Sequence, residues 1–484
     1  MLPPAVLGTA RRWRSDRLAE LRAWLAIPSV SGDPARAADV ARAARWVASW
    51  QRAHGARVEV VPTSRGRDVV LGHWAAPPGA PLLVIYGHYD VQPAGSGWSS
   101  DPFTPVVRDG VLYARGAGDD KGQLFAHLCA LDAWRQAGVP PMRVLVIAEG
   151  AEEVGSPGFE AVLRRLARRV RPRAVVVSDT ERAADGAPTV TVSQRGHLVG
   201  RLEVDTGGPD VHPGRLGGAV VDPSLVLAEA LLVLRDDLLP QLDTNPAQDL
   251  GAHLAQYNGA RAAQYVEVRT DAAVARAAGG RAMIGAGLDE RITLRGALDV
   301  TRLTTEARGG AVPARSAARI DLRLPPRADP AAVLRRARRL LDGLAPPGTT
   351  LRLRVAATTP GVATMPDAAI RRAADEACVV GFGRAPTYVR SGGTVPAVGM
   401  MARAFGIRPL LLGFGTPDGN AHGPDEAMDL RGWAAAVDTS AAFLFTFARQ
   451  IRAGPVSAGL QRDHHEESRR IRSGALSARI EGDE

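Results

Sequence analysis

The chain has 484 residues, a formal net charge of +9, and 45% hydrophobic, 23% charged and 5% aromatic residues. A chain of this length favours two domains, and the composition is typical of a soluble globular protein. Its two cysteines exclude a disulfide framework, and no run reaches the roughly 18 apolar residues that a membrane helix needs. The N-terminal segment lacks the pattern of a secretory signal, so we expect a cytoplasmic protein with no membrane partner.

The basic residues are almost all arginines, and Lys121 is the only lysine. They are spread along the chain and interleaved with Asp and Glu, whereas nucleic-acid-binding proteins concentrate their basic residues in a patch or stripe. Aromatic side chains that could stack on bases are sparse. We therefore expect no nucleic-acid partner.

Helices and strands alternate in the first 191 residues. The helices are predicted over residues 14–27, 35–54, 123–134 and 159–170. The strands are predicted over residues 58–61, 69–73, 82–86, 143–148 and 174–178. The last three strands are short, continuously apolar runs, which are typical of strands buried on both faces. This alternation predicts an α/β fold with a mainly parallel sheet flanked by helices.

The character of the sequence changes near Thr191. The following segment is predicted to contain strands over residues 200–204, 318–324 and 350–355, helices over residues 223–234 and 330–344, and an irregular stretch over residues 240–307. The α/β pattern then resumes with helices over residues 366–379 and 430–449 and a strand over residues 409–412. We therefore predict a first domain made of residues 1–191 and 357–453, an inserted α+β domain of residues 192–356, and a disordered polar tail over residues 454–484.

Acidic and imidazole side chains follow the predicted buried strands or begin the helices after them. These residues are His88, Asp119, Glu152, Glu153, Asp179 and His422. Ligands of open α/β sheets bind beyond the carboxyl ends of the strands, and imidazole and carboxylate groups are the usual ligands of zinc and similar ions. Taken singly, each residue has an ordinary structural explanation, such as a helix N-cap for Asp119. Taken together, they predict a metal site.

The glycine-rich run RGAGDDKG, which begins at Arg115, also has the general appearance of a phosphate-binding loop. It lacks the GxxxxGK[ST] spacing of such loops. We therefore assign it to the metal site and not to a nucleotide.

Five motifs resemble those of a known family. They are GHYDVQP from Gly87, GDDKG from Gly118, EGAEEVGS from Glu149, Ser178-Asp179, and Asn420-Ala421-His422. Their order and spacing are similar to those of the co-catalytic dizinc metallopeptidases, the family of carnosinase-like dipeptidases, aminoacylases, carboxypeptidase G and succinyl-diaminopimelate desuccinylase. The resemblance extends from LAIPSVSG near the N-terminus to about Arg449. It implies an α/β catalytic domain with an inserted α+β lid domain that also mediates dimerisation.

The resemblance implies a role for each residue of the predicted metal site. His88, Asp119 and Asp179 would hold one zinc ion. Asp119, Glu153 and His422 would hold the other, with Asp119 shared between them. Manganese or cobalt could replace zinc.

The resemblance also implies the acid–base groups. Asp90 would fix the orientation of His88. Glu152 would be the general base, taking a proton from the water that becomes a bridging hydroxide between the two zinc ions and passing it to the leaving amine. His212 would stabilise the oxyanion, in dimeric members from the partner subunit.

Substrate contacts are implied as well. Arg323 matches an arginine that grips the substrate carboxylate, although an ordinary surface arginine on a strand fits the sequence equally well. Gly393 and Thr394, in a backbone-rich loop, and Arg390 just before it would contact the same end of the substrate. Gly310 departs from the family, because relatives often carry Asn or Thr there.

The resulting prediction is a metal-dependent hydrolase that cleaves an amide bond next to a free carboxylate, with a dipeptidase as the first choice. Asp179 in place of Glu and the long lid segment resemble the dipeptidase branch. An N-acyl-amino-acid amidohydrolase, a deacylase, is the alternative. A catalytically silent binding protein on the same fold is a more remote one. The expected partners are a small peptide or N-acyl amino acid and a second copy of the chain, as a homodimer through the lid domain.

Overall fold

The computed structural model describes residues 3–63, 67–138, 140–242, 271–277, 279, 281–285, 287–305, 307 and 309–452. The chain divides into two compact units. The first comprises Met1–Val192, Thr364–Tyr388 and Val395–Glu484, and the second comprises Ser193–Ala363 and Val389–Thr394. The predicted tail over residues 454–484 and a large part of the predicted irregular stretch lie outside the described residues.

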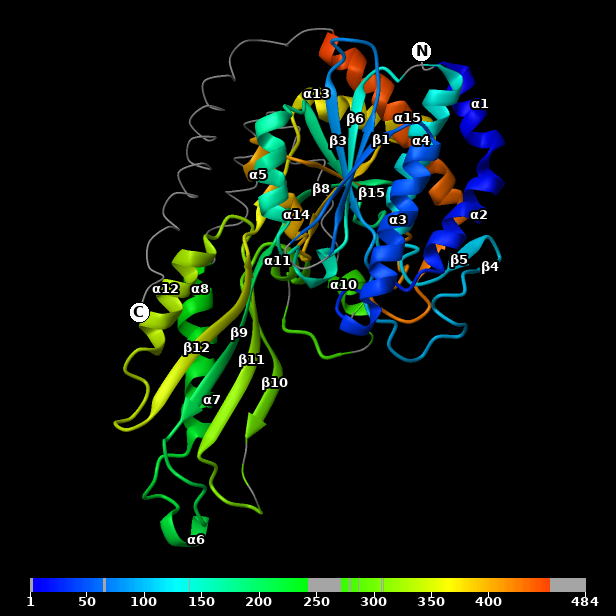
Figure 1. Ribbon diagram of the computed structural model, residues 1–484. Helices are drawn as coiled ribbons and strands as arrows, with labels where there is room; N and C mark the ends of the chain where they lie inside the picture. The colour runs from blue at the N-terminus through cyan, green and yellow to red at the C-terminus, as the bar shows by residue number, and fades with distance from the viewer. Residues whose placement is uncertain are drawn as a thin grey trace. The chain divides into compact units, whose positions relative to one another are not determined.

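A mixed sheet forms the centre of the first unit (Figure 1). Seven of its strands run in the order β1 (Arg57–Val61), β2 (Val69–Trp74), β6 (Arg143–Glu149), β3 (Leu82–His88), β7 (Ala174–Val177), β15 (Leu410–Gly413) and β8 (Thr189–Gln194). The four strands from β6 to β15 are parallel, and antiparallel strands flank them on both sides. The predicted α/β class is confirmed, with the parallel part at the middle of the sheet, where its apolar runs are buried on both faces.

Helices cover both faces of this sheet (Figure 1). The helices of the first unit are α1 (Pro4–Arg12), α2 (Arg14–Leu25), α3 (Ala37–Ala53), α4 (Lys121–Ala137), α5 (Phe159–Arg169), α13 (Ala368–Phe382), α14 (Pro396–Phe405) and α15 (Leu430–Arg452). Helix α15 packs against α4 and α13, while α5 packs against α14. No helix among the described residues is both long and apolar enough to cross a membrane.

A small sheet of β4 (Val106–Arg108), β5 (Val111–Tyr113) and β16 (Ala427–Asp429) lies apart from the central sheet. Strand β16 pairs with β5, which brings the segment after β15 beside the segment before α4. This sheet is not predicted from the sequence, because strands of three residues carry too short a hydrophobic pattern to detect. The chain just before β16, which carries His422, therefore lies near the chain just after β5, which carries Asp119.

The second unit contains a four-stranded antiparallel sheet in the order β10 (Ala297–Thr305), β11 (Arg315–Leu324), β9 (Gly196–Asp205) and β12 (Thr350–Thr359). Alternate side chains of β9 and β11 are buried and form one core with α7 (Pro223–Val233) and α12 (Pro330–Leu341). The α+β character expected of the insertion is therefore present.

One prediction for this unit is wrong. Strand β10 and helix α11 (Leu288–Thr293) lie within the stretch that the sequence analysis treats as irregular. No residue of β10 is fully buried, because it is an edge strand with a neighbour on one side only. Its sequence, ALDVTRLTT, therefore lacks the buried alternation by which strands are recognised.

Candidate metal centre

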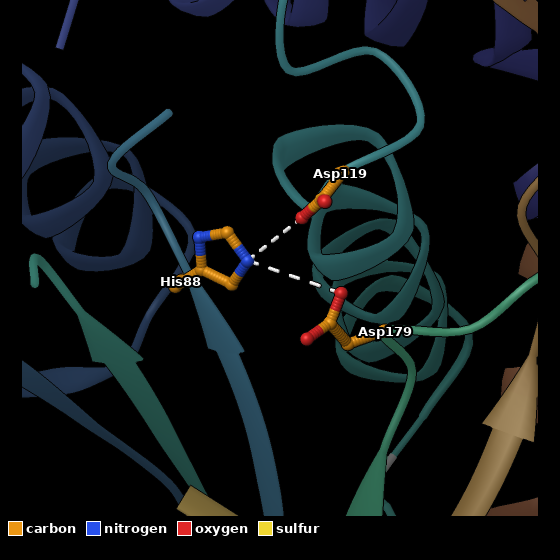
Figure 2. A group of neighbouring side chains, drawn as sticks. All are labelled: His88, Asp119 and Asp179. Atoms are coloured by element: carbon orange, nitrogen blue, oxygen red, sulfur yellow. Dashed lines mark hydrogen bonds and ion pairs between the residues drawn. The ribbon is translucent and has the colours of Figure 1, made fainter. Parts of the chain in front are cut away.

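His88 is the last residue of β3 and its side chain is fully buried. Its Nε2 lies 2.9 Å from Oδ1 of Asp119, which precedes α4, and 3.9 Å from Oδ1 of Asp179, which follows β7. Figure 2 shows the three side chains pointing toward one another from three separate elements. The ends of two neighbouring parallel strands and the start of a helix bring these residues together, as the sequence analysis expects from their positions.

Asp119 also belongs to a second group. Nε2 of His422 lies 3.0 Å from Asp119 Oδ2 and 3.3 Å from Glu153 Oε2. In each group, the potential ligand atoms all lie within 4.8 Å of one another. Gln92 donates a hydrogen bond of 2.8 Å to Glu153 Oε2, which fixes that carboxylate. The two groups together contain all five residues for which the sequence analysis predicts metal ligation.

Asp90 contacts this centre in two ways. Its main-chain carbonyl accepts a hydrogen bond of 3.0 Å from Nδ1 of His88, and its carboxylate lies 3.5 Å from the same nitrogen. The carboxylate also accepts hydrogen bonds from the backbone amides of Glu152 and Glu153, at 3.2 and 3.1 Å. Asp90 therefore orients His88 mainly through its backbone, while its side chain holds the backbone of the two glutamates.

Glu152 differs from its neighbour Glu153. Among the described residues, no hydrogen bond or ion pair engages the Glu152 side chain, and Glu152 belongs to neither ligand group. Burial, together with the negative charges of Asp179 and Glu153, raises the pKa of Glu152 well above its ordinary value. Glu152 therefore provides a carboxyl group beside the two ligand groups. This carboxyl group binds a proton more readily than an ordinary glutamate does.

The electrostatics of the centre reflect an excess of carboxylates over imidazoles. Burial and the charge of Asp119 raise the pKa of Asp179 to about 7. Hydrogen bonds to Asp119 and Glu153 raise the pKa of His422 to about 10. His88 is buried, which favours its neutral form, but its carboxylate neighbours raise its pKa well above the ordinary value. Such a set of groups favours bound positive charge.

The residues present fit a pair of divalent metal ions. Nitrogen and oxygen ligands at about 2.0–2.2 Å from a tetrahedral zinc ion lie roughly 3.3–3.6 Å from one another. The distances from His88 Nε2 and His422 Nε2 to the carboxylates, between 2.9 and 3.9 Å, bracket this range. Three carboxylates also compensate much of the charge of two dications. The same donor set suits manganese and cobalt, so it does not distinguish among these metals.

His212 belongs to the second unit and is exposed. It precedes the short helix α6 (Pro213–Leu216), and its Nδ1 accepts a hydrogen bond of 3.1 Å from the amide of Gly214. An imidazole that accepts at Nδ1 carries its proton on Nε2 when neutral. Two backbone hydrogen bonds between Val211 and Val312 hold the loop in place. The result is an exposed N–H donor on a fixed loop.

The other residues predicted to contact substrate also lie in the second unit. Nη2 of Arg323 donates to Asp321 at 3.0 Å and the side chain remains partly exposed. Arg390 makes a buried ion pair with Asp289 at 2.5 Å, so its charge is already compensated. A hydrogen bond inside the loop that follows Arg390 stabilises this loop: the amide of Gly393 donates to Ser391 Oγ at 3.0 Å.

Arg195 lies beside the loop that contains Gly393 and Thr394, and it is not among the residues predicted from the sequence. It is buried, donates to the carbonyls of Gly392 and Arg291, and accepts at its own carbonyl from the hydroxyl of Thr394. Burial, with the nearby charge of Arg323, lowers the pKa of Arg195 to about 10. A single arginine after a strand carries no signal that would identify it in the sequence.

Gly310 has a φ of +77°, and a Cβ placed on it would meet no atom within 4 Å. The position therefore needs a residue that tolerates left-handed backbone, as glycine and asparagine do. The departure from the family pattern at this position is a change that the backbone accommodates.

The amino-acid sequence matches a known protein family over the whole of this centre. The signature of peptidase family M20/M25/M40 covers residues 84–447, a span that includes both ligand groups. The chain belongs to this family. As an M20 peptidase it is a metallopeptidase, which confirms the enzyme class and the family expected from the motifs.

Similar proteins include dipeptidases. The Cys-Gly metallodipeptidase dug1 of Schizosaccharomyces pombe is 35% identical over 225 residues, which cover 43% of this chain and 47% of that protein. The chain thus matches only about half the length of that relative. The cysteinylglycine-S-conjugate dipeptidase of Corynebacterium striatum is 27% identical over 418 residues, covering 84% of this chain and 90% of the relative.

The fold also agrees with a solved structure. The dipeptidase Dug1p of Saccharomyces cerevisiae superimposes with a TM-score of 0.75 at 22% sequence identity, covering 92% of this chain and 98% of that one. The similarity confirms the architecture of this M20 peptidase.

Proposed function

We propose that this protein is a dipeptidase that cleaves an amide bond next to a free carboxylate. The observation that carries the proposal is the pair of ligand groups sharing Asp119, with the unengaged carboxyl group of Glu152 beside them. The names of the relatives from Schizosaccharomyces pombe and Corynebacterium striatum, both called dipeptidases, support the substrate class. The cytoplasmic location and the absence of nucleic-acid and membrane partners stay predictions.

The two ligand groups would hold two divalent ions, for which zinc is our first choice. Such a pair lowers the pKa of a water molecule and polarises the scissile carbonyl. Glu152 acts as the general base: it accepts a proton from the attacking water and delivers it to the leaving amine. The carboxylate of Asp90 supports this role, because it holds the Glu152 amide and so fixes where the base stands.

We propose that the inserted segment over residues 192–356 is a lid that also mediates dimerisation, and that His212 donates to the oxyanion from the partner subunit. The exposed Nε2–H of His212 supports this role, because an oxyanion needs a positioned donor. Arg323, Gly393 and Thr394 are proposed to contact the substrate carboxylate. Arg390, whose charge Asp289 compensates, is proposed to act by holding that loop.

Mixed dimers test whether His212 acts across the subunit interface. His212→Ala and Glu152→Gln should each be nearly inactive alone. If each active site combines His212 of one subunit with Glu152 of the other, a mixed dimer has one intact site. Random assortment of equal amounts then restores about a quarter of wild-type activity. We expect this recovery on co-expression of the two variants, measured as initial rates. Activity equal to the sum of the separate variants would place His212 in its own subunit's site or outside it.

A paired substrate panel tests the proposed function. Metal-free protein is reconstituted with Zn²⁺ or Mn²⁺ and assayed with and without a chelator. Each free-amine dipeptide is matched with the N-acetyl and N-succinyl derivatives of the same C-terminal amino acid. We expect chelator-sensitive cleavage of the dipeptides.

The other outcomes of the panel discriminate between the alternatives. Cleavage of the acyl amino acids alone would move the protein to the deacylases. No cleavage of any substrate, with two metal ions bound, would contradict the dipeptidase proposal and favour a substrate outside both classes. No bound metal and no cleavage would favour the silent binding protein.

A further inference from the structure

Glu426 is a fully buried carboxylate between β15 and β16 that belongs to neither ligand group. Its Oε1 accepts hydrogen bonds from the backbone amides of Gly118 and Asp119, at 2.8 and 3.0 Å. Its Oε2 accepts from the amide of Gly116 at 3.0 Å and from Nη1 of Arg115 at 2.8 Å. Four donors therefore converge on one carboxylate, which holds the backbone of Asp119 directly.

These contacts explain the glycine-rich run that begins at Arg115. Backbone amides that converge in this way form an anion-binding concavity, and Gly116 supplies a backbone conformation with a φ of +89°. The glycine-rich run is therefore an anion-binding loop. The anion is the chain's own Glu426.

Arg115 connects this carboxylate to the rest of the centre. Its side chain is buried, and Nη2 donates to the carbonyl of His422 and to the carbonyl of Pro93, both at 3.1 Å. Pro93 lies in the segment after β3 that also carries Asp90. The ion pair between Arg115 and Glu426 thus connects three stretches of chain: the segment of Asp119, the loop of His422 and the segment after β3.

We propose that Arg115 and Glu426 are positioning residues of the metal centre, whose ion pair sets the separation of Asp119 from His422. The proposal rests on the function proposed above, because it concerns the same two ions. Arg115 and Glu426 themselves belong to neither ligand group.

The ligand group that contains His422 depends on the ion pair between Arg115 and Glu426 more than the group that contains His88 does. His88 and Asp179 stand at the ends of β3 and β7, where the sheet holds them. His422 lies in an irregular loop and is itself in left-handed backbone with a φ of +66°, and its side chain is 56% exposed. The sheet does not hold this histidine, so the hydrogen bond from Arg115 to its carbonyl is a main restraint on its place.

A calorimetric titration of metal-free protein with Zn²⁺ alone tests the proposal without an activity assay. Wild-type protein should bind two ions. Glu426→Gln should retain one and bind the other at least tenfold more weakly, since outer-sphere changes cost about 10- to 100-fold in metal affinity. The backbone amides of residues 116–119 should also exchange with solvent faster in the metal-free variant than in wild type.

Two further variants separate positioning from stability. Asp132→Asn is the matched control, because Asp132 makes a buried ion pair with Arg17 at 2.6 Å that touches neither ligand group. It should lower the melting temperature while leaving both zinc affinities unchanged. Should Glu426→Gln fail to fold, the double variant Arg115→Met/Glu426→Gln removes both buried charges together, and the same weakening of one zinc site by at least tenfold is expected.

The outcomes distinguish this proposal from the proposed function. Two ions bound by wild type and by Glu426→Gln with affinities within twofold of each other would overturn the positioning role alone. Equal loss of zinc affinity in Asp132→Asn would also overturn it, because general destabilisation would then account for the effect. Wild-type protein that binds fewer than two ions would overturn the proposed two-metal function, and the positioning role with it.

Discussion

Replacing Glu152 with Gln is expected to lower kcat by about 10²- to 10⁴-fold, the usual contribution of a general acid–base group. The substitution removes the titrating oxygen and preserves the size of the side chain. Both metal ions should stay bound, because Glu152 belongs to neither ligand group. The measurements are kcat on the best dipeptide of the panel and zinc content by elemental analysis.

The control for this prediction is Glu160→Gln, which makes the same chemical change on the exposed face of α5. It should leave kcat and zinc content unchanged. Full activity in Glu152→Gln would exclude this residue as the base. Loss of zinc together with activity would mean that Glu152 acts as a ligand.

Replacing Asp119 with Ala is expected to weaken both zinc sites at once, by more than the roughly 100-fold that outer residues can cost. One carboxylate oxygen lies beside His88 and the other beside His422, so Asp119 alone is common to the two ligand groups. Activity should fall below detection. Calorimetric titration of the metal-free variant with Zn²⁺ measures both sites.

Single-site variants provide the comparison. Asp179→Ala and His422→Ala each alter one ligand group, so each should lose one zinc ion and retain the other. Asp39→Ala, a residue of α3 whose carboxylate pairs with Arg36 and Arg42 and belongs to neither ligand group, should retain both. If Asp119→Ala lost only one ion, the two groups would not share this carboxylate as a ligand.

The fold could be predicted where a hydrophobic period is long. The apolar runs of β3, β6 and β7 are buried on both faces, and each was recognisable because a strand in the middle of a parallel sheet needs no polar face. Strand β10 escaped prediction because it has a neighbour on one side only and buries no face completely. Helix α14 also went unpredicted, since it is short and its run contains Gly399.

The candidate ligands could be predicted because metal chemistry restricts the residue types. His88, Asp119 and Asp179 follow or adjoin strong secondary-structure signals, and their motifs keep the family's order. Glu426 could not be found in this way. It follows His422 by four residues, but nothing in its local sequence indicates that its carboxylate accepts three backbone amides from a segment more than 300 residues away.

The sequence by itself determined the α/β class, the metallopeptidase family and the chemical types of the ligands, because these depend on hydrophobic period and on motifs that are local in the chain. Only the tertiary structure decided which side chains act together. The carboxylate of Asp90 holds the amides of Glu152 and Glu153, and Glu426 closes the loop of Asp119, because folding brings distant donors around buried carboxylates that need partners. A buried charge must be compensated wherever the fold places it. The residues next to it in the sequence do not reveal which distant groups will compensate it.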